Sequence, residues 1–96
     1  MITLREASFK IPDGKLVKVK LKVSSGKITE LKILGDFFLH PEEVIMKIEE
    51  ELVGAQHDLV LLQTIIDEVL NNEEATLIGA SSSDIAKTII MAWDSK

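Results

Sequence analysis

The chain has 96 residues, no cysteine and a net charge of −5. A chain of this length builds one hydrophobic core, so a single domain over residues 1–96 is predicted. The absence of cysteine excludes disulfides, thiolate chemistry and cysteine-ligated metal clusters, and it fits a reducing compartment. Because there is no apolar leader and no apolar run approaches the ~18 residues of a membrane span, we expect a soluble, cytoplasmic protein without a membrane partner.

Charge is divided unevenly along the chain. Residues 1–35 carry eight basic and three acidic side chains, a net charge of +5, whereas residues 36–96 carry three basic and thirteen acidic side chains, a net charge of −10. One layer of the fold is therefore expected to be positive and the other negative, which matters more for the choice of partner than the total charge.

Period-two alternation predicts strands at residues 7–11, 17–23 and 28–34. The first strand ends at the turn Pro12-Asp13-Gly14, and the turn Ser24-Ser25-Gly26 joins the second to the third. Connections this short require antiparallel pairing, since a parallel return needs a long crossover. In the third strand, alternation places three side chains on one face: Thr29, Leu31 and Ile33.

The second predicted strand has one aliphatic face and one face of lysines. These lysines, which we call the lysine row, are Lys18, Lys20 and Lys22. The row is either a solvent face that discourages aggregation between sheets or an electrostatic surface for an anionic partner, an acidic protein or nucleotide phosphates. Nucleic acid is disfavoured, because the rest of the chain is acidic and no exposed aromatic residue interleaves the lysines.

Helical spacing predicts two helices between residues 41 and 72. The first begins at Pro41, ends at Gly54 and has an apolar stripe of Val44, Ile45, Ile48, Leu52 and Val53. The second begins after the N-cap Asp58, ends where Asn71-Asn72 breaks the pattern, and has on its inner side Leu59, Leu62, Ile65, Ile66, Val69 and Leu70.

A connector over residues 73–80 leads to a third predicted helix. Ser81 and Asp84 have the spacing of a capping box, with Asp in place of the usual Glu or Gln. The apolar residues of this helix are Ile85, Ile89, Ile90 and Trp93. We therefore predict an α+β fold, a three-stranded antiparallel β-meander packed on one face by about three α-helices.

Catalytic and metal-binding patterns are not found in the sequence. His40 and His57 are separated by a predicted helix, and neither has a second ligand four residues away. Gly79 precedes serines at a helix start but lacks the lysine of a phosphate-binding loop. We predict no metal site and no catalytic residue, so the chain alone is not expected to be an enzyme.

The segment Gly35-Asp36-Phe37-Phe38 marks the change from strands to helices. Gly accepts positive φ and Asp hydrogen-bonds the backbone that follows it, which predicts a tight turn. Phe37 and Phe38 either fill the joint between the two layers or lie at a binding surface.

The order of these parts resembles the C-terminal accessory domain of lipoate–protein ligases. The resemblance covers residues 15–54 and follows the lysine-rich strand with Ser25-Gly26, Gly35-Asp36-Phe37-Phe38, Pro41-Glu42-Glu43 and Leu52-Val53-Gly54. Two later segments fit the place where the family has a Gly turn before its last helix, Ile78-Gly79-Ala80 and Ser83-Asp84-Ile85-Ala86.

This resemblance implies the small subunit of a two-component, archaeal-type ligase, needed for making lipoyl-AMP and less so for lipoyl transfer. It implies a heterodimer with the catalytic subunit, with the lipoyl-acceptor domain involved only indirectly. Lipoate, ATP and Mg²⁺ are implied for the complex and none for this chain alone, because the adenylation motifs of the family's large domain do not occur here. The implied fold is similar to that of iron–sulfur scaffold proteins, without their cysteines.

The partner interface is expected at Gly35, Asp36, Phe37 and Phe38, with the lysine row as a secondary docking face and Asp36 fixing the turn. Two alternatives to the ligase role stay open. One is an autonomous protein-binding or scaffold module, such as a homodimer through the sheet edge. The other is a small-molecule carrier with a cavity between helices and sheet.

Overall fold

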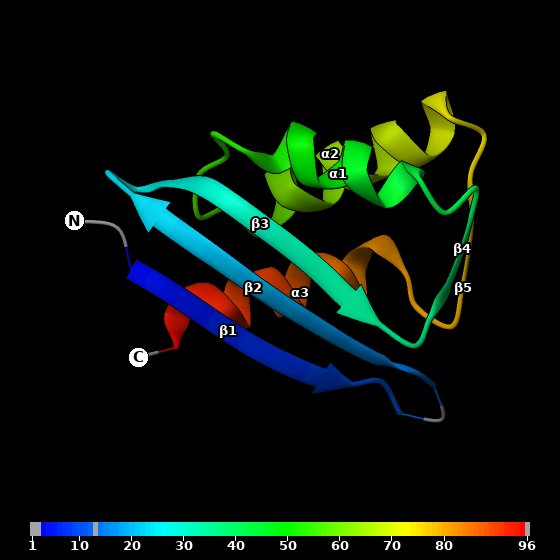
Figure 1. Cartoon of the computed structure of the whole chain (residues 1–96), viewed down its shortest axis with the longest axis horizontal. Coiled ribbons are helices and arrows are strands. Elements are labelled where there is room, and N and C mark those ends of the chain that lie inside the picture. Colours follow the sequence, from blue (N-terminus) through cyan, green and yellow to red (C-terminus); the bar gives the residue numbers. More distant parts are fainter. Residues whose placement is uncertain (1–2, 13, 96) are drawn as a thin grey trace.

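The computed structural model describes residues 3–12 and 14–95, which form a sheet with helices packed against it (Figure 1). The main sheet is antiparallel, has the order β1-β2-β3 and consists of β1 (Thr3–Lys10), β2 (Leu16–Ser24) and β3 (Lys27–Gly35). The predicted meander and the α+β class are therefore confirmed. Asp13, in the predicted first turn, lies outside the described residues.

The central strand β2 has one fully buried face and one open face. Its inner residues Val17, Val19 and Leu21 are at most 1% exposed, and they alternate with the lysine row on the outer face. Burial of this aliphatic stripe is the main reason for the strand, since it removes large apolar side chains from water.

A β-bulge interrupts the alternation of β3. The register passes from Lys22 opposite Glu30 to Val23 opposite Ile28, so Thr29 is the extra residue, and its hydroxyl donates to the Lys22 carbonyl oxygen at 3.1 Å. Ile28 takes the core position and is 1% exposed, whereas Thr29 is half-buried. The prediction that Thr29 shares a face with Leu31 and Ile33 was wrong, because the bulge shifts the alternation by one residue.

A second, two-stranded sheet consists of β4 (Phe38–His40) and β5 (Thr76–Ile78). The strands are antiparallel, with Phe38 opposite Ile78. This ribbon lies at the opposite end of the molecule from the β2–β3 hairpin (Figure 1). The sequence predicted only a connector over residues 73–80, because a three-residue strand is too short to show a period.

Three helices complete the fold: α1 (Val44–Leu52), α2 (Leu59–Asn72) and α3 (Ser82–Asp94). α3 packs against β1 and β2, α1 packs against β3, and α2 packs against both other helices. The helical residues of the core are Val44, Ile48, Leu52, Leu62, Ile66, Val69, Ile85, Ala86, Ile89, Ala92 and Trp93. Among the described residues, none of these helices is long and apolar enough to cross a membrane.

The helix ends partly match the predictions. The Asp58 carboxylate accepts from the Leu61 N–H at 3.2 Å, which confirms this N-cap. The Ser81 hydroxyl accepts from the Asp84 N–H at 3.1 Å and the Asp84 carboxylate accepts from the Ser81 N–H at 3.0 Å, which confirms the capping box. α2 ends at Asn72, so its predicted end is confirmed, with both asparagines still in the last turn of the helix.

Three helix predictions were wrong. α1 begins at Val44 rather than Pro41, because the Val44 N–H bonds to the Pro41 carbonyl three residues back and the segment between them is a tight turn. Val53 leaves the apolar stripe, because it follows the last helical residue in an extended conformation. Leu59 is exposed, because the first three side chains of α2 lie outside the core and burial begins at Leu62.

Candidate functional site

Asp36 clamps the turn that leads from β3 to β4. Its carboxylate accepts a hydrogen bond from the Leu16 N–H at 2.6 Å, and its own N–H donates to the Leu16 carbonyl oxygen at 3.2 Å. Gly35 lies directly before it with φ +156°, and a Cβ there would collide with the same Leu16 carbonyl and lie 2.8 Å from the Phe37 ring. The sequence Gly-Asp is therefore required by the close approach of the end of β3 to the start of β2.

The clamped turn sends the two phenylalanines in different directions. Phe37 is half-buried and packs against the core, so it fills the joint between the layers. Phe38 is 56% exposed and faces Ile78, which is 58% exposed, across the β4–β5 ribbon. Phe37 therefore has the geometry of a residue that fills the joint between the layers, and Phe38 has the geometry of a residue at a binding surface.

Exposed apolar side chains gather around Phe38. Phe38 and Leu34 line one shallow hollow of about 250 Å³, and Leu16 lies beside the clamped turn. We call this surface the apolar end, and it consists of Leu16, Leu34, Phe38 and Ile78. The role of Ile78 was not predicted from the sequence, because its position depends on pairing with Phe38, 40 residues earlier.

The lysine row lies on the outer face of the sheet and adjoins the apolar end. Lys18 is opposite Leu34 in the register, Lys20 is opposite Lys32, and Lys22 forms an ion pair with Glu30 at 3.1 Å. Lys18 thus connects the lysine row to Leu34, while the half-buried Phe37 contributes to the wall of the hollow that Leu34 and Phe38 also line.

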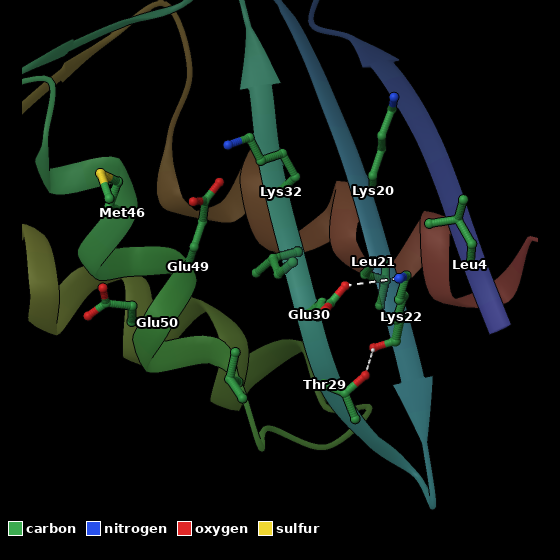
Figure 2. A pocket seen from close by; sticks show the side chains of 12 residues that line it. Leu4, Lys20, Leu21, Lys22, Thr29, Glu30, Lys32, Met46, Glu49 and Glu50 are labelled. Atoms are coloured by element: carbon green, nitrogen blue, oxygen red, sulfur yellow. Dashed lines mark hydrogen bonds and ion pairs between the residues drawn. The ribbon is translucent and has the colours of Figure 1, made fainter. Parts of the chain in front are cut away.

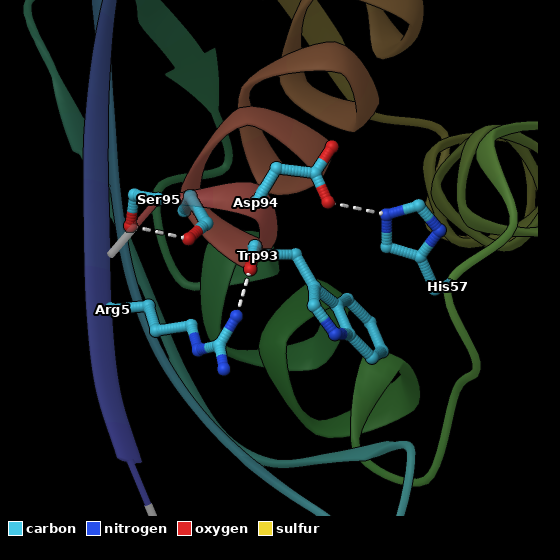
Figure 3. Close-up of polar contacts among 6 residues, drawn as sticks. Arg5, His57, Trp93, Asp94 and Ser95 are labelled. Carbon is cyan, nitrogen blue, oxygen red and sulfur yellow. Dashed lines mark hydrogen bonds and ion pairs between the residues drawn. The ribbon is translucent and has the colours of Figure 1, made fainter.

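A polar cluster at the C-terminal end of α3 involves His57 (Figure 3). His57 Nε2 lies 2.9 Å from an Asp94 carboxylate oxygen, and its ring meets Trp93 edge-on at 5.2 Å between centroids. Arg5 donates to the Trp93 carbonyl oxygen, and the Ser95 hydroxyl donates to a backbone carbonyl rather than to the histidine. The His57–Asp94 contact links the loop before α2 to α3, and the Arg5–Trp93 hydrogen bond links α3 to β1. Within residues 3–12 and 14–95, no hydroxyl group is hydrogen-bonded to the histidine.

Acidic and histidine side chains form no metal-binding group in the part of the chain that the structure describes. His40 is exposed on β4, opposite Thr76, whereas His57 lies in the loop before α2 and pairs with Asp94. The hydroxyl of Ser81 is used in the capping box of α3. The candidate site is the surface formed by the apolar end and the lysine row, which combines exposed apolar side chains with neighbouring lysines.

Comparison with known proteins identifies the family. A sequence model described as "Bacterial lipoate protein ligase C-terminus" matches residues 6–89. A search of curated proteins finds no match. A similar solved chain comes from Thermoplasma acidophilum, in a structure described as that of an archaeal lipoylation system with "a bi-partite lipoate protein ligase and its E2 lipoyl domain". The two chains are 25% identical in sequence and superpose with a TM-score of 0.77. The match covers 93% of this chain and 97% of that one. Because the family match spans most of the sequence, this chain belongs to the family of lipoate protein ligase C-terminal domains.

Proposed function

We propose that the chain is the non-catalytic accessory subunit of a bipartite lipoate protein ligase. In this role it joins a separate catalytic subunit and is required for the ATP-dependent activation of lipoate to lipoyl-AMP, before lipoyl transfer to an acceptor domain. The observation that carries the proposal is the match over 97% of a chain from a bi-partite ligase system, since that chain is about as long as this one. Membership in the family of lipoate protein ligase C-terminal domains, over residues 6–89, supports the same proposal.

The apolar end is the proposed anchor on the catalytic subunit. Phe38 and Ile78 form an exposed cross-strand pair on a two-stranded ribbon, and such a ribbon is marginal in water without a covering surface. Aromatic side chains in the centre of an interface contribute a large share of its affinity. Gly35, Asp36 and Phe37 support the anchor from behind by holding the turn.

The lysine row is the proposed secondary docking face. Lys18 adjoins Leu34, and Lys20 and Lys22 continue the positive surface along β2. Charged residues at the border of an interface mainly raise the association rate and select the partner.

In this mechanism the docked chain acts by position. It holds the nucleotide-proximal loops of the catalytic subunit in their closed conformation, which orients the reactants and keeps water from the mixed anhydride of lipoyl-AMP. Lipoate, ATP and Mg²⁺ are bound by the catalytic subunit, and this chain contributes no reacting group.

The test is a reconstitution with purified subunits. Lipoate-dependent release of pyrophosphate by the catalytic subunit is measured with and without this chain, and we expect an increase of more than about tenfold, equivalent to ~1.4 kcal/mol of activation free energy. Transfer from preformed lipoyl-AMP should depend on this chain much less. A catalytic subunit that works at full rate alone, or ATP consumption by this chain alone, would refute the proposal.

A further inference from the structure

An open groove of about 500 Å³ lies between the outer face of the sheet and α1 (Figure 2). Three of the side chains that line it are apolar and exposed: Leu4 is 62% exposed, Met46 is 59% exposed and Val53 is 49% exposed. In Figure 2, α3 lies behind the strands and so covers the opposite face of the sheet, whereas α1 lies beside β3 and forms one wall of the groove. Apolar side chains that gather along one groove are typical of a docking surface.

Two lysines in this groove face each other across adjacent strands. Lys20 and Lys32 are direct partners in the β2–β3 register, both side chains are exposed, and like charges in this arrangement destabilise a sheet. Neither lysine belongs to an ion pair among residues 3–12 and 14–95, whereas Lys22 is paired with Glu30 at 3.1 Å. An anionic partner accounts for a repulsive pair that costs the isolated chain stability. We call Lys20 and Lys32 the groove lysines.

The side chains around the groove lysines indicate which class of anionic partner fits there. Glu49 and Glu50 on α1 bound the positive strip on one side, and the Glu49 carboxylate is already used by the Ile33 N–H at 2.7 Å. A flat anionic membrane or a nucleic-acid backbone would meet these glutamates together with the lysines. A narrow protein segment with both carboxylates and apolar side chains fits the lysines and the apolar border at once.

The groove lies close to the apolar end on the same face of the sheet. Lys18 and Leu34 are direct register partners, and Leu34 is two residues, about 7 Å, from Lys32 along β3. A protein interface of ordinary size buries about 800 Å² on each side, which corresponds to a patch roughly 30 Å across. A partner centred on the apolar end is therefore large enough to reach the groove.

From these observations we infer that an acidic, amphipathic segment of the catalytic subunit lies in the groove. Its carboxylates pair with Lys20 and Lys32, and its apolar side chains cover the exposed apolar residues on either side. This inference rests on the proposed function, and it assigns the electrostatic contact to Lys20 and Lys32 rather than to Lys22, which already has an intramolecular partner.

The experiment measures the association rate of this chain with the purified catalytic subunit by stopped-flow fluorescence. The double variant Lys20→Glu/Lys32→Glu should associate at least about tenfold more slowly at low salt, and its rate should no longer fall as salt rises. The matched control is Lys27→Glu/Lys87→Glu, which changes the net charge equally but lies at the β2–β3 hairpin and on α3. The control should keep the wild-type rate within about twofold.

The single variant Lys32→Glu separates docking from a structural role. It replaces a repulsive cross-strand pair with an attractive one, so the isolated chain should unfold at a slightly higher temperature while association slows severalfold. A residue with a merely structural role would change stability and binding in the same direction.

Three results would overturn the inference. They are an unchanged association rate in the double variant, an equal loss in the control pair, and normal binding to the catalytic subunit combined with lost binding to the lipoyl-acceptor domain. Failure of the proposed function is a different result, because wild-type chain would then leave pyrophosphate release unchanged. Failure of this inference alone leaves that stimulation intact.

Discussion

The inner and outer faces of the sheet come from the same strands but contribute differently. On β2 the inner residues Val17, Val19 and Leu21 are closed off from solvent, and burying each side chain of this size contributes about 1.5–3 kcal/mol. On the outer face, the groove lysines oppose each other and exposed apolar side chains border them. The inner residues are accounted for by the stability that their burial gives the fold. The opposed lysines and exposed apolar side chains of the outer face do not stabilise the isolated chain, so a partner is expected on the outer face and at the adjoining apolar end.

Truncation of the inner face should give the largest effect. Leu21→Ala removes a side chain that is 1% exposed, and the lost burial plus the remaining cavity should lower the free energy of unfolding by about 2–5 kcal/mol. The matched variant is Lys20→Ala, the next residue on the opposite face, which should change it by less than about 0.5 kcal/mol. Urea denaturation of both variants measures the difference. Equal losses would show that the two faces do not differ as argued.

The turn that joins the two regions should be the next most sensitive. Gly35→Ala places a methyl group against the Leu16 carbonyl in a backbone conformation with φ +156°, so a loss of about 2–3 kcal/mol is expected. Gly26 is the control, because it also has positive φ, +75°, but no atom lies within 4 Å of an added Cβ. Gly26→Ala should cost about 1 kcal/mol. Thermal unfolding compares the two, and a larger loss at Gly26 would contradict the close approach at Gly35.

Truncation of the apolar end should reduce binding far more than stability. Phe38→Ala should weaken the complex with the catalytic subunit by about thirtyfold, ~2 kcal/mol, and lower the free energy of unfolding by less than about 1 kcal/mol. Phe37→Ala should show the reverse balance, because this ring packs against the core. Titration calorimetry and urea denaturation give the two quantities.

Val60 provides the control for this experiment. It is more exposed than Phe38 and lies on α2, away from the ribbon, so Val60→Ala should leave the affinity unchanged. Wild-type affinity in Phe38→Ala, or an equal loss of affinity in Val60→Ala, would show that Phe38 is not the anchor.

Local signals predicted most elements of the fold. The alternation of β2 gave the meander, and the caps at Asp58 and Ser81 were recognised because a cap needs only three or four neighbouring residues. The bulge at Thr29 and the start of α1 after Pro41 were missed, because each is settled by hydrogen bonds that compete with the local pattern. The β4–β5 ribbon was missed because its pairing spans nearly half the chain.

The surface was predicted less completely than the core. Alternation placed the lysine row on one face of β2, but the opposition of Lys20 and Lys32 depends on the register between strands, which the sequence does not display. Likewise, the pair of adjacent phenylalanines was recognised as a junction, but only the clamped turn decides that Phe38 points outward next to Ile78.

The ion pair of Lys22 and Glu30 should give the smallest effect. Both side chains are largely solvated, with exposed fractions of 42% and 67%, so a double-mutant cycle with Lys22→Ala and Glu30→Ala should give a coupling of about 0.2–0.5 kcal/mol that disappears at high salt. Urea denaturation of the four proteins provides the measurement. A coupling above about 1 kcal/mol, beyond what exposed pairs usually show, would mean that charges on the outer face hold the sheet together. The groove lysines would then need a structural explanation as well, and the argument that this face is reserved for a partner would lose its physical basis.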